Sequence, residues 1–339
     1  MADIAIVWDE RYADHDTGDH PESPERIGAI VEHLRTTDLW PRLQEVKPTM
    51  AEPSEVLRVH TRGHLERIRR AAEVRGGEWV DNDTYVSAQS FEVALLALGG
   101  VLDSLELWLE GLVPFALIRP PGHHATPDRA MGFCLFNNIA IAARRLLSLG
   151  YERVAIIDWD AHHGNGTQAS FLAERDVLYV SLHQWPLFPG TGWLDECGVG
   201  DGEGFTVNVP LPPGSRDGDF AHAFATLVEP IVDEFGPQAV LVSAGYDTHA
   251  RDPLGSMQLT ENGYGHMALR CLELAQRHAE GRLALALEGG YNLPALARSV
   301  EATLRALADE QAPEVGGTTA QAEEMVERAL AVQRRYWHI

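Results

Sequence analysis

The sequence contains little cysteine, and the cysteines that it has do not form a recognisable motif. The three cysteines, Cys134, Cys197 and Cys271, are odd in number and far apart, and none belongs to a CxxC pair. A disulfide framework or a cysteine-ligated zinc site requires cysteines that are paired or closely spaced. The pattern argues against both and predicts a protein of a reducing compartment.

Long hydrophobic runs are also missing. No apolar run reaches 18 residues, and residues 1–10 lack the basic and long apolar stretches of a secretory signal. Spanning a bilayer or entering the secretory route depends on such stretches. The sequence therefore predicts a cytoplasmic protein that does not enter a membrane.

Basic residues are scarce relative to acidic ones. The 27 Lys and Arg residues face 50 Asp and Glu residues, which gives a formal net charge of −23. Binding to nucleic acid through a basic surface needs clustered Lys and Arg, so this partner is not expected. The acidic excess would suit a cationic or neutral substrate, although it would equally serve solubility.

Short apolar strands alternate with helical patterns along the chain. The predicted strands lie at residues 4–8, 114–118, 154–157, 177–183, 205–209, 239–243 and 283–287. This alternation predicts an α/β fold in which a central parallel sheet is flanked by helices on both faces. No repeat or shift in composition divides the chain, so we expect one domain over residues 1–339. A short flexible break at 313–319 would precede a C-terminal helix within 321–339.

The most informative stretch of the sequence is 154–166, where an apolar strand ends in Asp and His residues. Asp158, Asp160 and His162 alternate, so they share one side of an extended segment. A carboxylate and an imidazole two residues apart can converge on one divalent cation at a strand's carboxyl end. A solvated loop is the simpler alternative, because Asp and Gly are ordinary turn residues. Unpaired charge directly after a buried strand is costly, which favours the metal site.

Polar or aromatic residues also follow four other predicted strands. They are His123 and His124, the aromatic loop 185–188, Asp247, and Tyr291. Each has an ordinary structural explanation when taken alone. In a parallel sheet the carboxyl ends of the strands share one edge, so we expect all five groups in one crevice. Their coincidence indicates an active site.

The residue types in this crevice suit metal-assisted hydrolysis of an uncharged acyl bond. Asp160, His162 and Asp247 supply three ligands and leave one position open, as in catalytic zinc sites. A neutral histidine of the pair 123–124 could accept a proton from a metal-activated water. Tyr291, which follows two glycines, could donate to a developing oxyanion.

Five motifs together resemble those of the zinc-dependent histone deacetylase family, most closely its class II branch and the bacterial deacetylase-like amidohydrolases. They are PGHHA at 121–125, GFCLFNN at 132–138, DWDAHHGNGTQ at 158–168, GYDT at 245–248 and EGGYN at 288–292. The matching motifs occur in the same order as in the family, from about residue 20 to residue 292. It implies the arginase/deacetylase fold, one catalytic Zn²⁺ and a structural monovalent cation, K⁺.

The resemblance also implies a role for each residue of the catalytic centre. The implied zinc ligands are Asp160, His162 and Asp247. His124 would be the general base, with His123 as its electrostatic partner, and Asp158 would pair with His123. Tyr291 would polarise the acetyl carbonyl, and Asn165 would support His124. The monovalent cation would be held by Asp158, Ser181 and Leu182, together with backbone oxygens of Asp160 and His162.

A tunnel for an acyl-lysine side chain follows from the same resemblance. Phe133 and Phe188 would form its aromatic walls, and the backbone carbonyl of Gly132 would face the substrate amide. Arg26 corresponds in position to the family's inner-channel arginine, and Asp83 would bind substrate backbone at the rim. Sequence alone does not decide whether Arg26 faces solvent or the interior.

Three positions bear on activity and on the choice of substrate. Asn165 stands where class I members carry an Asp, and Asn is usual in class II. Tyr291 is retained where some nearly inactive class II members carry His, which favours an active deacetylase. Leu254 replaces the acidic gatekeeper of polyamine deacetylases, which favours acetyl-lysine of a peptide or protein. Deacetylation of acetylpolyamines or other small acylated amines stays the alternative, with acidity supplied by Asp16, Asp19 and Glu22.

Two further alternatives are less well supported. A ureohydrolase would need a second metal and more ligands, but Thr248 and His249 follow Asp247, without a second Asp. A non-catalytic protein that binds acyl groups could lose the tyrosine, the base or a ligand, and all of these are present. The oligomeric state and the native metal stay open, because iron(II) or cobalt(II) also suits an Asp₂His set.

Overall fold

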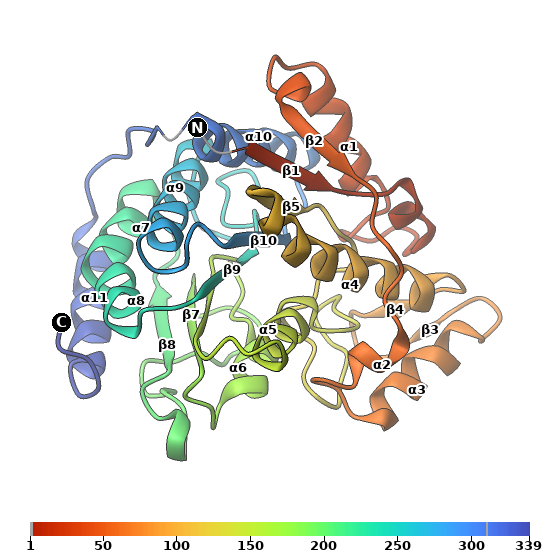
Figure 1. The fold of residues 1–339 in the computed structure, drawn as a ribbon, viewed down its shortest axis with the longest axis horizontal. Coiled ribbons are helices and arrows are strands. Elements are labelled where there is room, and N and C mark those ends of the chain that lie inside the picture. Colours follow the sequence, from red (N-terminus) through yellow and green to blue (C-terminus); the bar gives the residue numbers. More distant parts are fainter. Residues whose placement is uncertain (1–2, 310) are drawn as a thin grey trace.

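The computed structural model describes residues 3–309 and 311–339. Its centre is an eight-stranded sheet with the order β2-β1-β5-β10-β9-β6-β7-β8, and every neighbouring pair is parallel (Figure 1). The inner strands are buried on both faces, as parallel sheets require. The predicted α/β fold with a central parallel sheet is confirmed.

The strands of this sheet include all the predicted ones. They are β1 (Asp3–Val7), β2 (Leu43–Val46), β5 (Leu112–Ala116), β6 (Val154–Asp158), β7 (Val177–Gln184), β8 (Thr206–Leu211), β9 (Ala239–Ala244) and β10 (Leu283–Leu287). The edge strand β2 was not predicted, because its sequence LQEV is half polar and its two middle residues are exposed. A separate hairpin pairs β3 (Glu78–Trp79) with β4 (Tyr85–Val86) in antiparallel fashion.

Helices cover both faces of the sheet (Figure 1). On one face lie α4 (Ser90–Glu106), α5 (Asn138–Ser148) and α6 (Asn165–Phe171). On the other lie α1 (Glu25–Arg35), α7 (Asp217–Ala223), α8 (Glu229–Phe235), α9 (Glu261–His278) and α10 (Leu293–Asp309). A π-helical turn at Phe224–Val228 joins α7 to α8.

Three helices lie outside these two layers. They are α2 (Pro53–Val56), α3 (Arg62–Ala72) and the C-terminal α11 (Ala320–Gln333), which packs beside β8. Thr318 and Thr319, just before α11, both donate to Asp219 Oδ1, at 3.0 and 2.5 Å. Within the described residues, no helix combines the length and the apolar character needed to cross a bilayer.

His60 fastens the long loop that follows β5. Its Nδ1 donates to the Thr126 carbonyl at 2.9 Å, and its Nε2 accepts from the Asn137 amide at 2.8 Å. These two bonds fix the neutral tautomer of a side chain that is almost fully buried. The loop from residue 119 to 137 carries the two histidines of the site, so His60 helps to hold them in place.

We expect the free energy of unfolding to fall as the pH drops below about 6.5, partly through His60. Burial first, then the charge of His64, lowers the pKa of His60 from 6.5 to about 3. Between these values the unfolded chain binds a proton at this residue and the folded chain does not, so acid favours unfolding. Denaturant unfolding gives the free energy of unfolding at each pH between 7 and 4. Its decline with falling pH should be smaller in His60→Gln than in the unmodified protein, by about 1.4 kcal/mol per pH unit. Equal slopes in both proteins would contradict this role.

Candidate active site

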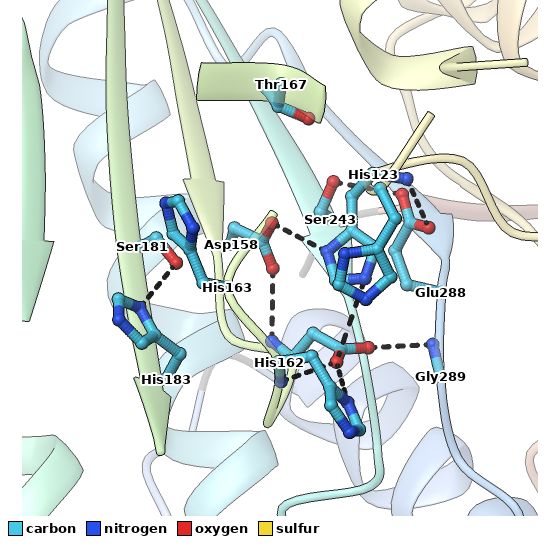
Figure 2. Close-up of polar contacts among 12 residues, drawn as sticks. His123, Asp158, His162, His163, Thr167, Ser181, His183, Ser243, Glu288 and Gly289 are labelled. Carbon is cyan, nitrogen blue, oxygen red and sulfur yellow. Dashed lines mark hydrogen bonds and ion pairs between the residues drawn. The ribbon is translucent and has the colours of Figure 1, made fainter. Parts of the chain in front are cut away.

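The sheet order brings the predicted polar groups to one edge. The strands β5, β10, β9 and β6 are consecutive neighbours, and each ends in one of the segments that carry these groups. His123, Asp158, His162 and Glu288 converge from three of these strand ends (Figure 2). The strand-end argument from sequence is thus confirmed in its geometry.

Asp160, His162 and Asp247 form a tight cluster. One potential ligand atom of each lies within 4.8 Å of the others. His162 Nδ1 is 3.1 Å from Asp160 Oδ1 and 2.8 Å from Asp247 Oδ2. The remaining carboxylate oxygens accept backbone amides, from Gly289 to Asp160 at 2.9 Å and from Ala161 to Asp247 at 2.7 Å. The backbone therefore aims one oxygen of each carboxylate at the imidazole.

The cluster fits a divalent cation on grounds of charge and space. Burial, then the charge of Asp160, raises the pKa of the Asp247 carboxyl, which shows the cost of two anions in this interior. A cation would remove that cost. A Cβ atom at Gly289 would lie 2.6 Å from oxygens of both carboxylates, so only glycine permits this approach.

His123 is held as the charged member of the histidine pair. Its Nδ1 lies 3.0 Å from Asp158 Oδ2 (Figure 2). The same oxygen accepts the Tyr179 hydroxyl at 3.0 Å. Burial alone would lower the pKa of His123, but the charges of Asp158 and Asp160 prevail and raise it well above 6.5. Its proton is therefore retained at neutral pH.

His124 is the neutral member of the pair. Its Nδ1 donates to Asn165 Oδ1 at 2.8 Å, an acceptor that carries no charge. Burial, and then the charges of His123 and His162, lower the pKa of His124 well below 6.5. With the proton on Nδ1, the Nε2 atom is free to accept another.

Tyr291 is fixed through its backbone and its ring. Asp252 Oδ2 accepts the amides of Tyr291 and Asn292 at 2.7 and 3.2 Å. The guanidinium carbon of Arg26 lies 5.1 Å from the centre of the Tyr291 ring. Among the described residues the Tyr291 hydroxyl has no hydrogen-bond partner, so it is available to a substrate.

Arg26 points into the protein and is fully buried. Its guanidinium donates to the carbonyls of Gly290 at 2.8 Å and Glu288 at 2.6 Å, directly behind Tyr291. It also pairs with Glu22 at 3.1 Å. The question that the sequence left open is settled by these contacts.

Phe133 and Phe188 pack against two side chains of the site. The Phe133 ring meets Tyr291 edge-on at 5.6 Å, and the Phe188 ring meets His124 edge-on at 5.2 Å. Gly132 and Phe133 both have positive φ, 55° and 69°, in a turn closed by paired backbone bonds between Met131 and Cys134. Left-handed backbone is strained for a phenylalanine, and such strain is typical of functional sites.

The other predicted site residues lie around this centre. The carboxylate of Asp83 accepts the Gly132 amide at 3.2 Å, next to Phe133. Leu254 is half-buried and its amide donates to Asp252 at 3.0 Å. Asp158 lies opposite Ser181 in the register of β6 and β7, and Leu182 follows on β7.

Several polar residues of the site were not assigned a role from sequence. Glu288 accepts the amides of Gly122 at 2.7 Å and His123 at 3.1 Å, and the Ser243 hydroxyl at 3.1 Å (Figure 2). Glu288 directly follows β10, so the same strand-end rule could have found it. Tyr179, inside an apolar strand, offered no such signal.

The acidic first loop is only partly available to a substrate. Glu22 is fully buried and paired with Arg26 and Arg119, so the idea that it supplies acidity to the pocket is wrong. Two buried guanidinium groups already neutralise it. Asp16 and Asp19, by contrast, are exposed to solvent.

The fold and this centre define a class: hydrolases of the arginase/deacetylase fold. Residues 20–307 match the family described as "Histone deacetylase domain", and the chain belongs to the histone deacetylase family. This family is one of deacetylases, which hydrolyse amide bonds. The predicted resemblance is confirmed.

Individual relatives agree with this membership. A "Probable deacetylase" of Archaeoglobus fulgidus is 44% identical over 293 residues, covering 85% of this chain and 81% of the relative. "Histone deacetylase HDA1" of Candida albicans is 36% identical over 94% of this chain, which spans 41% of that longer protein. The crystal structure of the HDA15 HD domain superposes with a TM-score of 0.92 at 36% identity, covering 99% of this chain and 95% of the other.

Proposed function

We propose that this protein is a zinc-dependent deacetylase that removes acetyl or short acyl groups from the side-chain amine of acyl-lysine. The observation that carries the proposal is the convergence of three kinds of group at one buried point. These are the Asp160–His162–Asp247 cluster, the neutral His124 and the Tyr291 hydroxyl, for which the described residues offer no hydrogen-bond partner. Hydrolysis of an amide needs a ligand set, a base and an oxyanion donor, and this point offers all three.

Asp160, His162 and Asp247 would hold the zinc ion. Zn²⁺ bound there would acidify a water and polarise the acyl carbonyl. The set contains no thiolate and leaves a position open, as expected of a catalytic rather than a structural zinc. All other steps fall to the side chains of the chain itself.

His124 would take a proton from the attacking water at Nε2 while a new C–O bond forms at the acyl carbon. The Nδ1–H bond to Asn165 fixes the tautomer that leaves Nε2 free. When the C–N bond breaks, the same proton would pass to the leaving amine, so atoms and charge balance. His123, charged beside Asp158, would stabilise the negative charge that develops.

Tyr291 would donate its hydroxyl proton in a hydrogen bond to the carbonyl oxygen as that oxygen gains charge. Its main chain is anchored by Asp252 and its ring by Arg26, so its position does not depend on the substrate. A preorganised donor of this kind acts mainly in the transition state.

The acyl-lysine stem would lie between Phe133 and Phe188, with the Gly132 carbonyl accepting the amide N–H and Asp83 at the rim. Asp158, Ser181 and Leu182, with backbone oxygens of Asp160 and His162, would bind K⁺ as a structural ion. Asp158 is fully buried at the end of β6, the third strand from the β8 edge of the sheet, and the β6–β7 register places Ser181 opposite it. We place the protein in the cytoplasm, since its three cysteines are buried and unpaired.

Two substrate classes are distinguished by one experiment. We expect the zinc-loaded protein to release acetate from an acetyl-lysine peptide with a higher kcat/KM than from acetylputrescine or acetylspermidine, because the rim residue Leu254 is apolar. Higher kcat/KM on the polyamines would make small acylated amines the substrate class. No release from either, with zinc bound, would contradict the deacetylase proposal.

A further inference from the structure

A chain of aromatic rings leads from the reaction centre to the surface. Tyr291 contacts Phe133 at 5.6 Å between ring centres, Phe133 contacts His20 at 4.6 Å, and His20 contacts Trp79 at 6.2 Å. The last ring, Trp79, contacts Tyr85 in a tilted arrangement across the β3–β4 hairpin, with 5.1 Å between ring centres. The hairpin is therefore linked to Phe133 and Tyr291 through consecutive ring contacts.

This hairpin is bound to Gly132 and Phe133 by their backbone amides as well. The Thr84 hydroxyl accepts the Phe133 amide at 3.1 Å, and Asp83 accepts the Gly132 amide at 3.2 Å. His20 Nε2 is 3.2 Å from the Asp83 carbonyl. Trp79 is thus held at a fixed distance from the strained turn at Gly132 and Phe133.

Trp79 is unusual for its exposure. It is 55% exposed, although the rings that lead to it are packed edge to face. A cavity of about 380 Å³ lies beside it, lined also by Tyr85 and Asp16. An exposed indole next to a cavity is a surface suited to contact with a ligand.

The lining of this cavity, over the described residues, carries a single charged residue, which is acidic. Asp16 is the one charged residue among its described lining residues, and no ion pair within the described chain engages Asp16 or its neighbour Asp19. An indole face attracts organic cations, and unpaired carboxylates nearby add to that attraction.

We propose that Trp79 and Asp16 form a subsite for a cationic side chain that flanks the acyl-lysine in a peptide substrate. This inference rests on the deacetylase function proposed above. A lysine stem enters between Phe133 and Phe188, and the adjoining peptide residues then pass over the rim toward the hairpin. An Arg or Lys one or two residues away would lie on the indole face with its charge toward Asp16.

The test uses acetyl-lysine peptides in which one flanking Arg is replaced by citrulline, an uncharged side chain of nearly the same shape. Affinities are measured by calorimetry in the Tyr291→Phe background, where bound peptide stays intact. We expect the Arg peptide to bind about two- to fivefold more tightly than its citrulline partner. The difference should disappear in Trp79→Leu, shrink in Asp16→Asn and shrink in high salt.

Control variants and peptides test whether a change in affinity comes from the subsite itself rather than from a change in folding or catalysis. Trp79→Leu should bind the citrulline peptide as before, and Trp79→Phe should keep part of the Arg preference because it keeps a ring. Trp40→Ala, a remote and half-buried indole, should leave the preference unchanged. Equal affinities for Arg and citrulline peptides, or an unchanged ratio in Trp79→Leu, would overturn the proposal.

Two other outcomes distinguish a failure of the deacetylase proposal from a failure of the peptide assignment. No turnover of either peptide by the zinc-loaded protein with Tyr291 intact would refute the deacetylase function, while the affinity ratio still decides the subsite. A preference for acetylspermidine over the uncharged N-butylacetamide that depends on Trp79, without any Arg preference among peptides, would overturn the peptide assignment.

Discussion

Replacing Tyr291 by phenylalanine should lower kcat on an acetyl-lysine peptide by about 100- to 1,000-fold. The change removes one hydroxyl that has no partner among the described residues and that would donate only as the carbonyl oxygen gains charge. Asp252 holds the backbone at this position, and Arg26 packs on the ring, so phenylalanine keeps the same wall. KM and zinc content should therefore change little, because the lost interaction belongs to the transition state.

Steady-state kinetics and metal analysis of the purified variant check this expectation. Tyr151→Phe, which alters a tyrosine at the opposite end of the sheet near the start of β6, is the matched control and should keep full activity. If Tyr291→Phe kept more than a tenth of the original kcat, the tyrosine would not be the oxyanion donor.

Replacing Asp247 by asparagine should abolish stoichiometric zinc and reduce kcat/KM by more than about 100-fold. Losing a hydrogen-bond partner of a ligand already costs 10- to 100-fold in metal affinity, and this change weakens a ligand itself. Asparagine is nearly isosteric and can still accept the Ala161 amide, so the loop should keep its shape. The effect is then one of charge, because a single carboxylate remains beside His162.

Zinc per protein by elemental analysis and kcat/KM at several zinc concentrations measure the two effects together. Excess zinc should restore part of the activity if the ligand set is correct. Asp176→Asn, an exposed carboxylate at the amino end of β7, is the control and should retain one zinc. Full zinc occupancy in Asp247→Asn would show that the metal lies elsewhere.

The fold was largely predictable because it depends on short-range patterns. Buried parallel strands are continuous apolar runs, and helices between them show their own period, so β5, β6, β7, β9 and β10 were all found. The edge strand β2 was missed because an edge needs no apolar run, and only its pairing with β1 makes it a strand. The β3–β4 hairpin was missed for a similar reason, since each of its strands has two residues.

The sequence by itself determined the candidate ligands and the edge at which they meet. Alternation through the end of β6 and the segment that follows it predicts that Asp160 and His162 share a side, and the parallel sheet predicts that Asp247, after β9, lies nearby. Both are local or topological consequences of the pattern.

Only the tertiary structure decided how the polar side chains are paired. Whether Arg26 faces inward depends on carbonyls more than 260 positions away along the chain, and the exposure of Trp79 beside Asp16 depends on how a hairpin packs against the first loop. Burial lowers the pKa of both His123 and His124, but the nearby carboxylates of Asp158 and Asp160 raise that of His123 well above its usual value. His124 has no such net compensation, because the charges of His123 and His162 lower its pKa further. Such contacts are set by the packing of distant segments, and the electrostatics of a buried site follow from distance and burial rather than from residue type.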